Sequence, residues 1–253
     1  MTPTNILTGT TNITAALPSE TITVWYGLIK TQDSNYRHYW QMLDVNEQHH
    51  AQQLKNELVQ RRYVTVHGQL RCLLAQTLQQ APEKLIINKA AHGKPYLADY
   101  PQLAFNLSHS GNVFVIALGW HCQLGIDVES VKQRPNLPAL VKKCFAQEEA
   151  DYWQQLPDEQ KTAEFYRFWT RKEAFVKATG FGIALGLQHC VINPQKPSTF
   201  LRLPAACGDA ENWRIQDIDL PNLGTNIIYS ALSIDKTITA VQINELPVMF
   251  QFC

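Results

Sequence analysis

Runs of β-branched and aromatic residues alternate along this chain with longer stretches in which leucines recur at helical spacing. The first apolar run, at 21–29, combines both residue types and predicts a strand. Leucines spaced for one helix face recur through 45–80, which predicts a helical region in two or three pieces. A short strand is expected near 84–88, and Gly and Pro then indicate a turn at 92–97.

The middle of the chain continues this alternation. Residues 103–120 predict two strands joined by a turn at 110–112, and residues 123–130 predict a third strand. A second helical region is expected over 137–179. Gly180 suits the end of that region, because glycine adopts a positive φ without steric cost.

The order strand, helices, strands therefore occurs twice, and residues 181–252 are expected to be mostly β because Pro, Gly and Asn interrupt short apolar runs. Two triplets at i, i+4 and i+8 spacing support a duplication: Tyr63, His67 and Arg71, and Trp169, Glu173 and Lys177. We predict an α+β fold of two similar α/β halves, a pseudo-dimer, with the active site in the cleft between them. Such clefts are common ligand sites.

The boundaries of these parts follow from composition. Residues 1–20 are rich in Thr and Asn and lack the charged start and apolar core of a signal peptide. We expect them to form a disordered tail. An N-terminal half is expected at 21–120, and a C-terminal half at 121–253 that carries the metal ligands proposed below.

Charge and cysteine content narrow the function classes. The 22 basic and 22 acidic residues among 253 give zero net charge, which argues against a nucleic-acid coat or a membrane-surface protein. No apolar run reaches the roughly 18 residues needed to span a bilayer. The six cysteines form no CxxC pair and show no zinc spacing, which is typical of a reducing compartment. We expect a cytoplasmic protein that binds neither nucleic acid nor membrane.

Two carboxylates on one predicted strand are the first candidates for chemistry. Because strand side chains alternate between faces, Asp127 and Glu129 point one way, while Ile126 and Val128 point into the core. Like charges at this spacing repel each other, and a cation between them removes that penalty. The alternative is a strand with one solvated polar face.

A helical segment supplies a third carboxylate. Trp169, Glu173 and Lys177 share one helix face. Glu173 fits a metal ligand, a general base, or both by turns, and Lys172 and Lys177 are point charges suited to phosphate oxygens. The alternative is an ordinary surface Glu–Lys pair. Three acids suit one hard divalent cation, and the lysines suit the phosphates it would hold.

Two further segments fit anion binding. Ser108 and His109 lie where a strand enters a Gly-containing turn, which lets the backbone approach an anion closely. Lys94 is followed by Pro95 and would form a rigid cationic tip. A surface turn explains both segments as well. A Ser108–His109 nucleophile pair is disfavoured, because adjacent strand residues face apart and no triad acid is evident.

Four segments in this order, GKPYL, FNLSHSG, GIDVE and FWTRKEAFVKATG, resemble the Sfp-type 4′-phosphopantetheinyl transferases. They spread across roughly 60–185, and the D-x-E followed about forty residues later by W-x-x-K-E-A-x-x-K is a specific signature. The chain length is similar to that of the two-halved, monomeric class. The resemblance implies transfer of the phosphopantetheine arm of coenzyme A to a serine of an apo acyl or peptidyl carrier protein, releasing adenosine 3′,5′-bisphosphate.

The resemblance also implies roles for individual residues. It implies Mg²⁺, or Mn²⁺, held by Asp127, Glu129 and Glu173. Its catalytic residues are Glu173, which deprotonates the carrier serine, and Lys177. Its coenzyme A contacts are Arg62, Lys94, Ser108, His109, Lys172 and Lys177.

One departure concerns the first helical region, where family members often place basic residues near the 3′-phosphate. Here the segment EQHHAQQLKNELVQRR is rich in Gln and His, and Arg62 aligns best among its cations. A carrier-docking patch is expected at 131–145, with Leu137, Leu140 and Val141 exposed beside two lysines. The alternatives are another metal-dependent phosphoryl enzyme, which would need a basic groove, or a non-catalytic module of the same fold.

Overall fold

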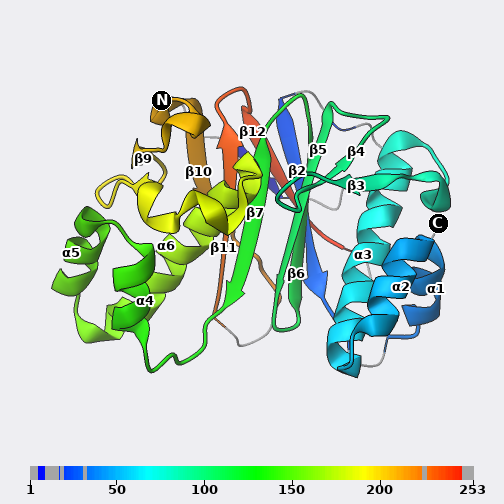
Figure 1. The fold of residues 1–253 in the computed structure, drawn as a ribbon, viewed down its shortest axis with the longest axis horizontal. Coiled ribbons are helices and arrows are strands. Elements are labelled where there is room, and N and C mark those ends of the chain that lie inside the picture. Colours follow the sequence, from blue (N-terminus) through cyan, green and yellow to red (C-terminus); the bar gives the residue numbers. More distant parts are fainter. Residues whose placement is uncertain (1–4, 9–16, 18–19, 31–32, 224–226, 247–253) are drawn as a thin grey trace.

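The computed structural model describes residues 5–8, 17, 20–30, 33–223 and 227–246. Strands fill its centre, helices α1–α3 lie on one side, and helices α4–α6 lie on the opposite side (Figure 1). Within the described residues, no helix is long and apolar enough to cross a bilayer.

Two main sheets form this centre. The five-stranded sheet has the order β1 (Asn5–Thr8), β12 (Ala240–Glu245), β2 (Thr21–Leu28), β6 (Val113–Trp120), β5 (Leu103–Ser110). The three-stranded sheet has the order β10 (Trp213–Asp217), β11 (Ile228–Asp235), β7 (Leu124–Ser130). The two small hairpins are β3 (Ile87–Lys89) with β4 (Pro95–Leu97), and β8 (Val191–Ile192) with β9 (Phe200–Arg202). Only β1–β12 and β12–β2 pair in parallel among these described strands.

The helices are arranged in two matching sets: α1 (Tyr36–Met42), α2 (Val45–Gln53) and α3 (Glu57–Leu78), then α4 (Leu137–Cys144), α5 (Gln147–Gln155) and α6 (Asp158–Thr179). Asp44 and Glu47 form a capping box that satisfies free amide groups at the start of α2. Gly180 ends α6 with φ of 74° and donates its N–H to the Val176 carbonyl, as the sequence predicted. The short helix α1 was not predicted.

The predicted duplication is confirmed by the topology. Each half runs strand, three helices, a 3₁₀ turn, a small hairpin and two long antiparallel strands. In both halves the strand that comes last in the chain lies in space between the other two. The spatial orders are β2-β6-β5 and β7-β11-β10. In each half a nine-residue helix also precedes a 22-residue helix.

The residue correspondence proposed from helical spacing was wrong. Arg71 and Lys172, not Lys177, occupy equal positions, 14 residues after the starts of α3 and α6. Each buried cation pairs with the glutamate at the third position of the preceding helix, Glu47 for Arg71 and Glu149 for Lys172. Spacing of i, i+4 and i+8 recurs along any helix face, so it could not fix this alignment.

Both buried cations also donate to backbone carbonyls at the 3₁₀ turn that follows. Arg71 donates to the carbonyl oxygens of Pro82, the first residue of η1 (Pro82–Lys84), and of Leu85, which follows η1. Lys172 donates to those of Leu187 and Cys190, around η3 (Leu187–His189). The long helix of each half is therefore tied in the same way to the helix before it and the turn after it.

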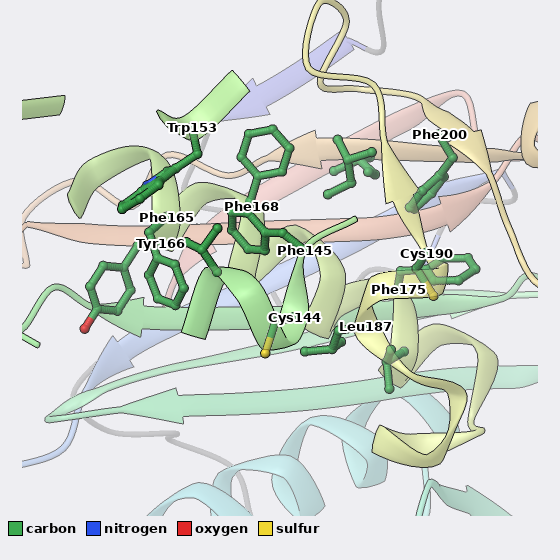
Figure 2. Packing of buried hydrophobic residues seen from close by; sticks show 14 of the residues in the cluster. Cys144, Phe145, Trp153, Phe165, Tyr166, Phe168, Phe175, Leu187, Cys190 and Phe200 are labelled. Carbon is green, nitrogen blue, oxygen red and sulfur yellow. The ribbon is translucent and has the colours of Figure 1, made fainter. Parts of the chain in front are cut away.

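Among the described residues, the three largest of four apolar clusters fill the layers. One lies between α3 and the five-stranded sheet, and a second lies between the two sheets, where Ile126 and Val128 face the side chains of β2 and β6. The third packs α4–α6 together, with Phe145, Phe165 and Phe168 near one another (Figure 2). Burial of Ile126 and Val128 in the second cluster leaves the other face of β7 toward α6.

Two expected boundaries differ from the structure. Most of the proposed tail lies outside the described residues, but Asn5–Thr8 forms strand β1 rather than disordered chain. Strand β12 falls within the range expected for the C-terminal half, yet it lies between β1 and β2 in the first sheet. Strand β12 is an interior parallel strand supplied by a chain that returns from the far half, and local sequence patterns do not reveal this return.

Candidate active site

The site lies at the seam between the two sheets, where β5 of the first half faces β7 of the second. Polar side chains on alternate residues of β5 bridge this seam. Asn106 accepts from the Ile126 amide at 2.9 Å, Ser108 donates to Asp127 at 2.8 Å, and Ser110 donates to Glu129 at 2.8 Å. Strand alternation places these three β5 residues on one side, so a strand edge that lacks a backbone partner is closed by side chains.

Helix α6 approaches this seam closely because β7 contains a glycine. A Cβ at Gly125 would lie 2.2 Å from the Ala174 carbonyl oxygen and 2.2 Å from the Ala178 nitrogen. Only glycine allows such an approach of helix to strand. This contact sets Glu173 and Lys177 of α6 over the polar side of β7.

Asp127 is buried and pairs with a cation. Its Oδ1 atom lies 2.7 Å from Lys177 Nζ and also accepts from Ser108, while Lys177 donates to Ser108 at 2.8 Å. The other carboxylate oxygen, Oδ2, is buried and has no hydrogen-bond partner. An unpaired buried carboxylate oxygen is costly, and a ligand that supplies positive charge would remove that cost.

Glu173 is half-buried beside the two strand carboxylates. Burial raises the pKa of Glu173, the negative charges of Asp127 and Glu129 also raise it, and Lys177 opposes this. The three predicted metal ligands therefore lie near enough to feel one another's charge. Sequence reasoning identified this group from the strand period and the helical position alone.

These carboxylates fit a hard divalent cation by donor chemistry and by the free Oδ2 atom of Asp127. As the side chains stand, no group of three or more His, Cys, Asp or Glu within the described ranges is arranged to hold a metal ion. The other oxygens of the two strand acids already have partners: Asp127 Oδ1 accepts from Lys177 and Ser108, and Glu129 accepts from Ser110 and Trp169.

A pocket of about 680 Å³ opens beside Glu173, and residues of both halves line it. Helix α6 contributes Glu173 and Lys177, and the β3–β4 hairpin contributes Lys94. The opposite wall comes from α2 and α3, where the Tyr63 and His67 rings stack with centroids 4.0 Å apart. The predicted cleft between the halves therefore exists and reaches the candidate catalytic helix.

Sequence reasoning missed that opposite wall. His67 Nδ1 lies 3.5 Å from a Glu47 oxygen, and the His50 ring packs 4.8 Å from Tyr63. The i, i+4 spacing of Tyr63 and His67 was noted only as evidence of a repeat. The sequence signal for this wall was a polar helix that carries His50 and directly precedes the helix of Tyr63 and His67.

Lys94 lines the pocket, but its amino group is engaged by backbone. Lys94 Nζ donates to the carbonyl oxygens of Ala178 at 2.5 Å and Leu124 at 3.2 Å, so it joins the first half to the end of α6. Burial lowers the pKa of Lys94 to about 8. A phosphate contact by this residue stays a prediction.

Arg62 and His109 gather near the other end of the seam. Arg62 is half-buried and donates to the Asn112 side chain at 3.2 Å. Partial desolvation lowers the pKa of His109, although the residue is exposed, and the charges of His67, Lys177 and Arg62 lower it further. Mutually repelling cations in one place favour an anion, so these contacts also stay predictions.

The structure places Lys172 away from the pocket. Its amino group has no exposed surface, lies 2.7 Å from Glu149, and donates to two backbone carbonyls in the interior of the second half. Neighbours on a helix point about 100° apart, so Lys172 and Glu173 cannot share one site. This placement does not support the expected phosphate contact.

The expected exposed patch at 131–145 also differs. Leu137 and Val141 are buried in the apolar cluster of the second half, and Leu140 packs against that cluster. Of the three apolar residues and two lysines expected at the surface, only Lys142 and Lys143 are exposed. The apolar stripe of α4 covers the core rather than a partner.

Comparisons with known proteins agree with this architecture. Residues 30–120 match a family model described as 4′-phosphopantetheinyl transferase, N-terminal, and residues 123–227 match the 4′-phosphopantetheinyl transferase superfamily. A putative 4′-phosphopantetheinyl transferase of Synechocystis sp. is 34% identical over 179 residues, which cover 70% of this chain and 72% of that protein.

Two further relatives match over shorter stretches. The 4′-phosphopantetheinyl transferase HetI of Nostoc sp. is 38% identical over 57% of this chain and 63% of its own length. The 4′-phosphopantetheinyl transferase psf-1 of Bacillus pumilus is 38% identical over 42% of this chain and 44% of its own. The two matched models meet near the seam between the halves, and the chain belongs to the 4′-phosphopantetheinyl transferase superfamily.

Proposed function

We propose that this protein transfers the 4′-phosphopantetheine group of coenzyme A to a serine hydroxyl of an apo acyl or peptidyl carrier protein, as an Sfp-type, holo-carrier-protein synthase. The reaction uses Mg²⁺, with Mn²⁺ as the alternative ion, and releases adenosine 3′,5′-bisphosphate. The names of the family models and of the relatives support the reaction class.

One observation carries the proposal: Glu173 lines an inter-half pocket large enough for a nucleotide-sized ligand, and it lies near enough to Asp127 and Glu129 to feel their negative charge. Phosphoryl transfer depends on positioning and charge neutralisation more than on covalent catalysis. Carboxylates beside Lys177 offer both functions in one place.

The proposed chemistry balances around one phosphorus atom. The carrier serine oxygen attacks the pantetheine-side phosphorus of the coenzyme A pyrophosphate, and the bond from that phosphorus to the bridging oxygen breaks. Adenosine 3′,5′-bisphosphate leaves with the bridging oxygen, and Glu173 takes the serine proton. Burial and the charges of Asp127 and Glu129 raise the pKa of Glu173 in the site without a bound cation.

Asp127, Glu129 and Glu173 would hold the divalent cation, which when bound supplies charge neutralisation at the pyrophosphate oxygens. Lys177 stands against Asp127 and would offer a fixed positive charge to the same phosphates. The Tyr63 and His67 wall closes the pocket on the side of the first half. Ser108 keeps Asp127 and Lys177 in register through hydrogen bonds to both.

Two further predictions concern the carrier protein and the assembly state of the enzyme. The carrier protein would dock at the mouth of the pocket, and the enzyme would act as a cytoplasmic monomer. Exposed Lys142 and Lys143 would suit an acidic carrier surface.

Intact-mass spectrometry of an apo carrier protein tests the proposal. Incubation with this protein, coenzyme A and Mg²⁺ should add the mass of one phosphopantetheine, and EDTA should prevent the gain. No gain across acyl and peptidyl carriers, with coenzyme A still bound, would favour a non-catalytic relative. Absence of coenzyme A binding would reject the proposal.

A further inference from the structure

Glu129 is held differently from the other two acids of the site. Each of its carboxylate oxygens accepts one hydrogen bond: Oε2 from Ser110 Oγ at 2.8 Å, and Oε1 from Trp169 Nε1 at 3.2 Å. Ser110 comes from β5 of the first half, and Trp169 comes from α6 of the second. The carboxylate is thus fixed from two elements, neither of which is its own strand.

Both donors are neutral, and that distinguishes Glu129 from Asp127. Asp127 forms an ion pair with Lys177, whereas no ion pair involving Glu129 occurs among the described residues. A salt bridge would neutralise the carboxylate. Neutral donors orient it and leave its full negative charge available to a cation.

The donors are themselves fixed in place. Ser110 Oγ also accepts from the Ser130 amide at 3.1 Å, and Ser130 Oγ donates back to the Ser110 carbonyl oxygen at 3.1 Å. The Trp169 ring stacks on Phe165 at 5.9 Å, against the apolar cluster of the second half. Donors locked by packing and by further hydrogen bonds can hold a carboxylate in one orientation.

We propose that Ser110 and Trp169 are positioning residues that orient Glu129 for the divalent cation, an inference that rests on the proposed function above. They act through Glu129 and do not themselves contact the ion. Because outer hydrogen bonds fix the direction of metal-binding oxygens, their removal lowers metal affinity more than it lowers the rate at saturating metal.

The test compares Ser110→Ala, Trp169→Phe and the double variant with the unmodified enzyme. Phenylalanine keeps the stacked ring and loses the N–H group. Mn²⁺ affinity is measured by electron paramagnetic resonance titration at saturating coenzyme A, without carrier protein. We expect each single change to weaken binding by roughly 10-fold or more and the double change by about 100-fold. In turnover assays the apparent KM for Mg²⁺ should rise, while kcat largely recovers at high Mg²⁺.

Matched controls separate orientation from general damage. Trp153→Phe removes another indole hydrogen bond in the same half, to the Lys161 carbonyl oxygen, and should leave Mn²⁺ affinity unchanged. Ser110→Thr keeps the hydroxyl and should restore most of the affinity lost in Ser110→Ala. Thermal unfolding of each variant checks that the fold persists.

The outcomes also separate this inference from the proposed function. Equal Mn²⁺ binding by the unmodified enzyme and Asp127→Ala would reject the metal site itself. Binding that is lost in Asp127→Ala but is within twofold of normal in the double variant would overturn the positioning role alone. Equal losses in Trp153→Phe and Trp169→Phe would also overturn it, because the effect would then not be specific to Glu129.

Discussion

The two halves of this protein share a scaffold and differ in what one strand presents to its long helix. On β2 of the first half, Trp25 faces α3 and joins an apolar cluster with leucines of that helix. On β7 of the second half, the corresponding side carries Gly125, Asp127 and Glu129 toward α6. Where the first half fills the space with an indole, the second brings the helix closer and leaves carboxylates at the seam.

The contacts that hold each half together remain alike in the two halves. A buried cation ties the long helix to the preceding helix and the following turn in both halves, with Arg71 in one and Lys172 in the other. Two repeats can therefore keep one packing plan while a single strand face acquires chemistry. The candidate active site lies where that face meets the edge strand of the other half.

The largest effect is expected from the strand that distinguishes the halves. Asp127→Asn removes the charge that pairs with Lys177 and keeps the shape of the side chain. Loss of a ligand that contributes several kcal/mol to transition-state stabilisation should lower phosphopantetheine transfer at least about 1,000-fold. The intact-mass assay measures this, and Asp219→Asn at an exposed position provides the control. Retention of more than a tenth of the activity would remove Asp127 from the catalytic site.

The shared scaffold can be tested with Arg71→Met and Lys172→Met. Each removes a buried cation from its acids, which are the half-buried Asp44 and Glu47 in the first half and the buried Glu149 in the second. Removal of one member of a buried pair typically costs about 3–5 kcal/mol of unfolding free energy. Urea denaturation should show similar losses for both variants. A loss below about 1 kcal/mol in either one would show that the two devices are not equivalent.

The close approach of α6 to β7 predicts a smaller loss in Gly125→Ala. The added Cβ would meet the Ala174 carbonyl oxygen at 2.2 Å, and overpacking of this kind costs about 1–3 kcal/mol. Gly93→Ala is the matched control, because nothing lies within 4 Å of its added Cβ and only its φ of 86° causes strain. Activity should fall with stability in Gly125→Ala, since α6 also carries Glu173. Equal, small effects in both variants would contradict the packing argument.

The smallest effect concerns the lysine that joins the halves. The folded pKa of Lys94, about 8, lies below the ordinary lysine value near 10.5, because burial disfavours its charge. Between these two values the unfolded chain binds more protons than the folded protein, so stability rises with pH across this window. Relative to Lys94→Met, the unmodified protein should therefore gain unfolding free energy from pH 8 to 10. Urea midpoints of the pair at both pH values measure this, and a relative loss would contradict the assignment.

Local patterns predicted most of the elements and the three acids. The strand period placed Asp127 and Glu129 on one face, and a glycine marked the end of α6 at residue 180. Helix geometry separates adjacent residues by about 100°, which directs Lys172 away from Glu173. From the sequence we nevertheless expected a phosphate contact, because Lys172 lies beside Glu173 in the motif.

Other features depend on contacts between distant segments. The return of β12 to the first sheet and the ties of Ser110 and Trp169 to Glu129 join residues that local periodicity treats separately. The polar alternation Asn106, Ser108, Ser110 was visible in the sequence, but its partner strand was not. From the sequence we wrongly expected the apolar side chains of α4 at the surface. A helical pattern predicts an apolar stripe, but it does not show whether the protein core or a partner covers that stripe.

The anomalous signal of Mn²⁺ in crystals grown with coenzyme A and Mn²⁺ would show which half of the protein binds the metal. We expect one strong peak in coordination contact with Asp127, Glu129 and Glu173, with the pyrophosphate beside Lys177. A peak beside Glu47 and His67, on the pocket wall supplied by the first half, would show that the metal does not bind at Asp127 and Glu129 of β7. That result would contradict the proposed site.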